Sequence, residues 1–162
     1  MRHSVPELLD LLRFLFPQFN RQFFGGELPD YEIRVEPLIG RTIIIIKLRN
    51  GKYRPQRLGA NDLYGSCIAE EQLIFIGSQC AALEDEFIRE VLLHEMCHAA
   101  VSRNAPKPSN GNPHGPEFVA ELRRLAALGE AWAGEEAQYY QTVPLDHQAV
   151  LPLDAWRTAR NA

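Results

Sequence analysis

The chain of 162 residues has few cysteines, no long apolar run and no excess of basic charge. Its longest aliphatic run is four isoleucines at 43–46, whereas a membrane-spanning helix needs about 20 apolar residues. A formal net charge of −4 argues against a globally basic nucleic-acid-binding protein. The three cysteines show no C-x-x-C spacing, which excludes a zinc ribbon and a disulfide framework and fits a reducing cytoplasm: Cys67, Cys80 and Cys97.

What the chain does have is the composition of an ordinary globular domain, with 46% hydrophobic and 23% charged residues. Near the N-terminus, Ser4 followed by Glu7 predicts a capping box at the start of a helix. Pro17 is expected to break or kink this helix. A second helical piece then carries three phenylalanines and ends at Gly25-Gly26: Phe19, Phe23 and Phe24.

The middle of the chain reads as short strands. Residues 31–38 alternate between apolar and charged side chains, which predicts a half-buried strand. Residues 41–49 are rich in isoleucine and predict a buried strand, and Asn50-Gly51 is typical of a hairpin turn. We expect a loop over 55–62. Two further short strands are predicted at 63–69 and 73–76.

Helices return in the second half. A helix is predicted over 84–102, a loop over 102–113, and a helix that begins at Pro116 and ends at Gly129. Residues 131–141 also have helical character. Helices, then strands, then helices favour an α+β domain in which a small sheet packs against the helix over 84–102.

That helix contains the sequence His94-Glu95-Met96-Cys97-His98, an H-E-x-x-H motif. Residues four apart lie on one face of a helix, so two imidazoles there can bind one cation, and Zn²⁺ suits nitrogen ligands. Glu95 is placed to act as a general base on water bound to such an ion. The motif therefore predicts metal-assisted hydrolysis, most often of a peptide bond.

The alternative is that His94 and His98 are ordinary helix residues. The helix is apolar on both sides of the motif, which predicts that it is buried. Buried imidazoles without partners are costly, and a metal ion would remove that cost. The metal interpretation is therefore favoured.

A catalytic zinc needs a third protein ligand and an open position for water. The candidates are His114, Glu117 and Glu121. We favour His114, because Gly115 allows a close backbone approach and Pro116 starts a helix there. For the donor that stabilises the oxyanion, three tyrosines are candidates: Tyr64, Tyr139 and Tyr140.

The motif and the sequence His114-Gly115-Pro116-Glu117-Phe118 together resemble the SprT-like (Spartan-type) zinc metalloprotease domain family. Residues 15–29 are similar to the N-terminal helix and turn of that family. The resemblance implies a minimal zincin fold, zinc bound by three histidines (His94, His98 and His114), and Glu95 as the base. It places the metalloprotease domain at residues 1–129, followed by a partly helical or irregular extension at 130–162. Eukaryotic members of the family cut proteins crosslinked to DNA.

One basic segment stands out, since residues 37–61 contain no acidic side chain. Arg49, Lys52 and Arg54 in this segment are the candidates for contacting nucleic acid. We therefore expect a zinc-dependent peptidase that acts on protein substrates, including DNA-associated ones. The alternative is a metal-bearing adaptor that binds nucleic acid or protein with little turnover, although a pure binding module has no need of a base at Glu95. If the extension at 130–162 inhibits the enzyme, truncation after Gly129 should raise the activity of the enzyme.

Overall fold

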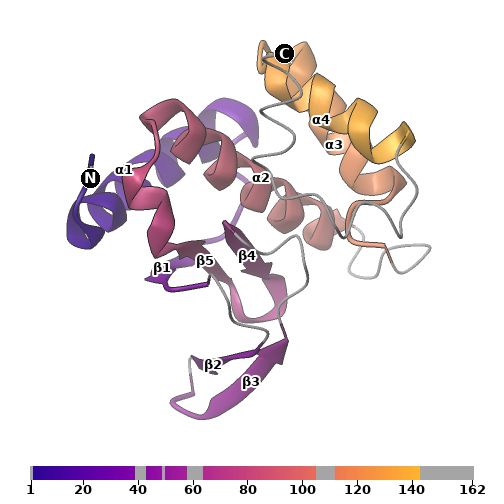
Figure 1. The fold of residues 1–162 in the computed structure, drawn as a ribbon. Helices are drawn as coiled ribbons and strands as arrows, with labels where there is room; N and C mark the ends of the chain where they lie inside the picture. The colour runs from indigo at the N-terminus through magenta and orange to yellow at the C-terminus, as the bar shows by residue number, and fades with distance from the viewer. Residues whose placement is uncertain (1, 39–42, 49, 58–63, 105–111, 143–162) are drawn as a thin grey trace.

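The structure, a computed structural model, describes residues 2–38, 43–48, 50–57, 64–104 and 112–142. These residues form four α-helices, five strands and two short 3-10 helices, which confirms the predicted α+β class (Figure 1). The helices are α1 (Val5–Phe23), α2 (Asp85–Asn104), α3 (Pro116–Ala127) and α4 (Ala131–Thr142). The strands are β1 (Glu32–Glu36), β2 (Ile43–Lys47), β3 (Tyr53–Arg57), β4 (Gly65–Ile68) and β5 (Leu73–Gly77), with η1 (Ala69–Glu71) and η2 (Ser78–Ala82) as the 3-10 helices.

Helix α1 begins as predicted, because Ser4 and Glu7 exchange side-chain hydrogen bonds with each other's backbone N–H groups. The expectation that Pro17 breaks the helix and that a second helical piece follows is wrong, since α1 is one helix that continues to Phe23; a kink at Pro17 stays a prediction. Pro17 lies on the exposed face, where water can satisfy the carbonyl group that loses its helical partner, while the buried face packs without interruption. The helix ends at Gly25 and Gly26, which both adopt positive φ, as predicted.

The main sheet has three strands in the order β1-β5-β4. β1 runs parallel to β5, and β4 runs antiparallel to it at the other edge. Every residue of β5 is buried, because its alternate side chains enter two separate cores: Ile74 and Ile76 face the main core, and Leu73 and Phe75 face a smaller one. Helix α1 contacts β1, and α2 contacts β4 and β5, so the helix that carries the motif packs on the sheet as predicted (Figure 1).

Strands β2 and β3 form a separate hairpin that extends away from the helices (Figure 1). Its turn at Asn50-Gly51 is confirmed, with Gly51 at φ +82°. The prediction of a buried strand at 41–49 is wrong in part: Ile46 is buried, whereas Ile43 and Ile45 are 55% and 65% exposed. A two-stranded ribbon has only one face on the core and leaves the other in water.

The loop predicted over 55–62 is also wrong at its start, because Pro55 lies in β3 opposite Ile45. Proline is tolerated there because both strands of a two-stranded ribbon are edges. The rest of that loop, residues 58–62, lies outside the described residues, as does most of the loop predicted over 102–113.

The second half of the fold agrees with the predicted helices. Helix α2 begins at Asp85, one residue after the predicted start, and continues to Asn104, two residues beyond the predicted end. Helix α3 begins at Pro116, and α4 spans the third predicted helix. The division of the chain at residue 129 stays a prediction, but α4 lies beside α3 and buries Trp132, Ala133 and Ala137 (Figure 1). Among the described residues, no helix combines the length and the apolar character needed to cross a membrane.

Candidate metal centre

Two of the predicted ligands lie one turn apart on α2. His94 is 7% exposed and His98 is half-buried, and their ring centroids are 5.0 Å apart. The spacing of four residues puts both rings on the same face of the helix, as the sequence predicts. This face of α2 points toward the turn that leads into α3, where the third histidine lies.

His114 reaches this face from the turn before α3. Its backbone N–H donates to Asn112 Oδ1 at 3.0 Å, and the N–H of Gly115 donates to the carbonyl oxygen of Asn112 at 3.0 Å. Asn112 therefore fixes the backbone that carries His114. The Nε2 atom of His114 lies 3.2 Å from Nε2 of His98 and 3.3 Å from Nε2 of His94. The structure thus brings together the three residues that the sequence predicts as ligands.

These separations suit a single bound ion. Zinc–nitrogen bonds of about 2.0 Å in a tetrahedral site put neighbouring ligand atoms about 3.3 Å apart. Within the described residues, the three imidazoles form a cluster whose donor atoms all lie within 4.8 Å of one another. Phe118 of α3 lies beside all three rings, with centroid distances of 4.3 to 4.9 Å, and supplies an apolar wall.

The electrostatics also suit a cation. Burial and the neighbouring imidazoles hold the pKa of His98 well below the ordinary histidine value. Burial and the ring of His94 do the same to the pKa of His114. Both rings are therefore neutral near pH 7, which is the form that binds metal. His94, His98 and His114 could hold a metal ion.

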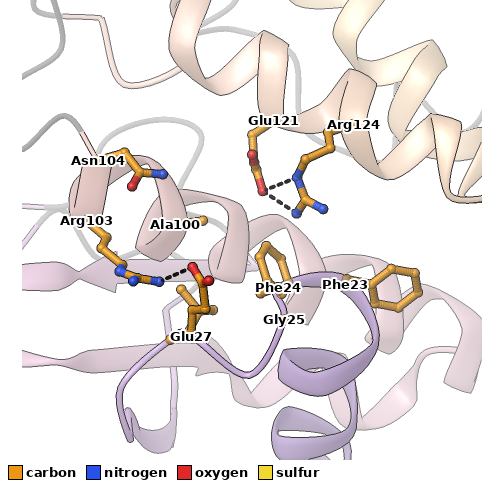
Figure 2. A pocket seen from close by; sticks show the side chains of 10 residues that line it. Phe23, Phe24, Gly25, Glu27, Ala100, Arg103, Asn104, Glu121 and Arg124 are labelled. Carbon is orange, nitrogen blue, oxygen red and sulfur yellow. Dashed lines mark hydrogen bonds and ion pairs between the residues drawn. The ribbon is translucent and has the colours of Figure 1, made fainter.

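The carboxylates considered as alternative third ligands are not part of this cluster, which includes neither Glu117 nor Glu121. Glu121 faces a separate pocket of about 320 Å³, where it accepts a hydrogen bond from Arg124 Nε at 3.0 Å (Figure 2). In the same pocket Arg103 pairs with Glu27. Glu121 therefore forms an ion pair with Arg124 on the side of α3 that faces this pocket.

Glu95, the predicted base, is 5% exposed and follows His94 on α2. Its side chain lies against Gly65, the first residue of the edge strand β4. A Cβ atom at position 65 would come within 2.7 Å of Glu95 Oε1, so only glycine leaves room for the carboxylate where it lies. The residue type at 65 and the position of Glu95 are therefore linked.

A comparison with protein families gives a match to the SprT-like family over residues 12–140. The chain belongs to the SprT-like family. No curated protein and no solved structure matches it. The family match confirms the resemblance seen in the sequence. It includes the three histidines and Glu95, and it also includes most of α4.

Helix α4 of this SprT-like protein supplies a residue that the sequence analysis missed. Glu136 is 3% exposed, and its Oε1 lies 2.7 Å from Nδ1 of His94. A glutamate inside a helix has no distinctive local pattern, so its sequence neighbours do not indicate burial. The one available signal is its spacing of four residues from Tyr140, which puts both side chains on one face of α4.

Of the three tyrosines considered as oxyanion donors, Tyr140 lies against the metal centre. Its ring stacks on His114, with centroids 4.4 Å apart and planes 5° apart. Burial, the charge of Glu136 and a side-chain hydrogen bond with Glu136 raise the pKa of Tyr140 well above its ordinary value. Tyr64 packs edge-on against Phe87 in the main core, and Tyr139 lies beside Tyr140.

Two of the candidates for contacting nucleic acid in this SprT-like protein, Lys52 and Arg54, lie on the hairpin rather than on the helices of the metal centre. Lys52 is exposed next to the turn. Arg54 is half-buried, and its Nη2 atom lies 3.4 Å from Oε1 of Glu70, so an acidic group lies within ion-pair distance of its charge. Arg49 lies outside the described residues.

Proposed function

We propose that this protein is a zinc-dependent peptidase that hydrolyses protein substrates. The observation that carries the proposal is the convergence of three imidazole rings, in which Nε2 of His114 lies 3.2 Å from that of His98 and 3.3 Å from that of His94. The carboxylate of Glu95 lies on α2, the helix that carries His94 and His98. His94, His98 and His114 would hold the zinc ion. The nitrogen-only donor set favours zinc over calcium or magnesium, which prefer oxygen ligands.

A zinc ion bound there would lower the pKa of a coordinated water and polarise the carbonyl of the scissile bond. Glu95 takes the proton of the attacking water and passes it to the nitrogen of the leaving amine. Because Glu95 is buried against β4, its carboxylate is held in place before the substrate arrives. The fixed position of this carboxylate, rather than its basicity, then makes Glu95 an effective base.

The sheet edge supports a polypeptide as the substrate. Among the described residues, β4 pairs with β5 on one side only, and Gly65 at its start contacts Glu95. An extended peptide that adds to β4 as a further strand would have its backbone close to the base. Addition of a strand to a sheet edge is a common mode of peptide recognition.

The experiment is digestion of casein by the purified protein, with and without a chelator, beside the Glu95→Gln variant. We expect cleavage that the chelator abolishes and that zinc restores. Glu95→Gln should retain the metal, measured by elemental analysis, and lose turnover. Wild-type turnover in Glu95→Gln would contradict the mechanism. A wild-type protein that binds zinc but cleaves no protein would favour the adaptor with little turnover.

DNA-associated proteins are the proposed substrate subclass, and the hairpin supports this choice. Lys47 and Lys52 are exposed there. Tyr53, which follows Lys52, is 68% exposed. Basic groups beside an exposed aromatic ring are typical of surfaces that bind single-stranded nucleic acid. Replacement of Lys52 and Arg54 by alanine should lower the salt dependence of binding to single-stranded DNA, by about 0.7 in slope for each phosphate that the variant no longer neutralises. An unchanged slope would remove the hairpin as the nucleic-acid surface.

A further inference from the structure

Helix α4 lies beside α3 and presents Glu136 and Tyr140 to the histidine cluster from one face. We propose that these two side chains are positioning residues, which fix the rings of His94 and His114 so that the site is formed before a metal ion binds. The proposal rests on the proposed function, because it concerns the same site. It assigns to α4 a role that neither the H-E-x-x-H motif nor the third histidine indicates.

The contact between Glu136 and His94 decides which nitrogen faces the cluster. A carboxylate only accepts hydrogen bonds, so His94 donates from Nδ1 to Glu136 Oε1 across 2.7 Å. The Nε2 atom of His94 then carries the lone pair, and this atom lies 3.3 Å from Nε2 of His114. Glu136 thus selects the tautomer that can bind a metal and holds the ring in that orientation.

The contact between Tyr140 and His114 restricts the second ring. The two planes are 5° apart with centroids separated by 4.4 Å, so the histidine ring cannot rotate about its axis without losing the stack. The tyrosine is itself held, because its hydroxyl shares a side-chain hydrogen bond with Glu136. One carboxylate is therefore connected to two of the three imidazoles, directly to His94 and through the tyrosine to His114.

Simple core packing does not explain these residues. Trp132, Ala133 and Ala137 already bury the apolar face of α4. A carboxylate that is 3% exposed is costly unless it is paired, and an apolar side chain of similar volume would fill the space at 136 without that cost. The gain from Glu136 is therefore expected in the geometry of the imidazoles rather than in the stability of the fold.

The experiment measures zinc affinity by competition with a chromophoric chelator in the full chain, together with the unfolding midpoint of the metal-free protein. Glu136→Leu should leave the metal-free midpoint unchanged or higher and weaken zinc binding about 10- to 100-fold. Glu136→Gln, whose amide oxygen can still accept from His94, should recover most of the affinity. Glu135→Gln removes an exposed carboxylate from the next position and is the matched control, with wild-type affinity expected.

The tyrosine is tested in the same way and remains informative if a variant at 136 does not fold. Tyr140→Leu should weaken zinc binding, and Tyr140→Phe, which keeps the stacked ring, should weaken it less. The absorption spectrum of the cobalt-substituted protein should change in Glu136→Leu and Tyr140→Leu, because ligand geometry controls it. Wild-type zinc affinity in both leucine variants would overturn the positioning role while leaving the peptidase proposal intact. A wild-type protein that binds no zinc would overturn both.

Discussion

The carboxylate of Glu95 lies in the space that a side chain at position 65 would fill, and Gly65 leaves that space open. A Cβ atom there would come within 2.7 Å of Oε1 and 2.9 Å of Cγ of Glu95. Strand β4 and helix α2 therefore meet at the proposed base. Glu95 can hold its carboxylate there only because residue 65 is a glycine. The relationship joins two residues that are 30 positions apart in the chain.

The substitution Gly65→Ala should displace the carboxylate of Glu95 by a fraction of an ångström to one ångström. Since misplacement on this scale costs on the order of 100-fold in rate, kcat for protein cleavage should fall by about that factor. The three atoms nearest to a Cβ atom at position 65 all belong to Glu95 rather than to a histidine of the metal centre, so zinc content should stay at the wild-type level. Steady-state cleavage rates and elemental analysis check the two halves of this prediction. Equal activity of Gly65→Ala and wild type would show that Glu95 tolerates displacement.

Protonation of the buried imidazoles should make the metal-free protein sensitive to acid. The folded-state pKa values of His98 and His114 lie well below 6.5, so below this pH the unfolded chain binds more protons than the folded one. The free energy of unfolding should therefore fall as the pH decreases through 6.5, by up to about 1.4 kcal/mol per pH unit for each ring. Above that pH the contribution of these rings should be constant.

Urea unfolding at pH 7.5 and pH 5.5, in the presence of a chelator, measures this dependence. His114→Gln removes one of the two titrating rings and should reduce the loss of stability between the two pH values. A loss that is the same in His114→Gln and wild type would assign the acid sensitivity to other groups.

The parts of this protein that sequence reasoning can predict are those with a local pattern. The H-E-x-x-H spacing fixes His94 and His98 on one helix face, and Gly115-Pro116 marks the turn that carries His114. The contributions that it misses depend on contacts between distant segments. Nothing near Gly65 or Glu136 in the sequence says that they contact Glu95 and His94, because those contacts arise only when β4 and α4 pack around α2.

The errors within the fold have the same origin. The local effect of Pro17 predicts the end of a helix, but the packing of the buried face of α1 outweighs one missing hydrogen bond. The residue type of the isoleucines in β2 predicts burial, yet in a two-stranded ribbon alternate positions face water. Local propensity identifies both elements correctly and misjudges their context.

This alternation on β2 gives a matched pair of substitutions. Ile46 is 1% exposed in the smaller core, and Ile45 beside it is 65% exposed. Ile46→Thr should lower the free energy of unfolding by at least about 2 kcal/mol, because it removes buried apolar atoms and buries a hydroxyl group. Ile45→Thr keeps a β-branched side chain on the exposed face and should change it by less than about 0.5 kcal/mol. Denaturant unfolding of the two variants checks the prediction, and equal effects would contradict the orientation of the hairpin.

Truncation after Gly129 should abolish metal binding rather than release an inhibited enzyme. It removes α4, and with it Glu136 and Tyr140 and the buried side chain of Trp132. Loss of one buried tryptophan alone costs about 3 to 5 kcal/mol, so the shortened chain should also unfold at lower denaturant concentration.

Truncation after Thr142 is the matched control, because it removes residues 143–162 and keeps α4 complete. Zinc affinity, unfolding midpoint and casein cleavage should stay close to wild type in this variant if α4 is the part that matters. Higher cleavage after truncation at 129 than in the full chain would contradict this account, since a helix that holds the imidazoles in place cannot be removed with a gain in activity.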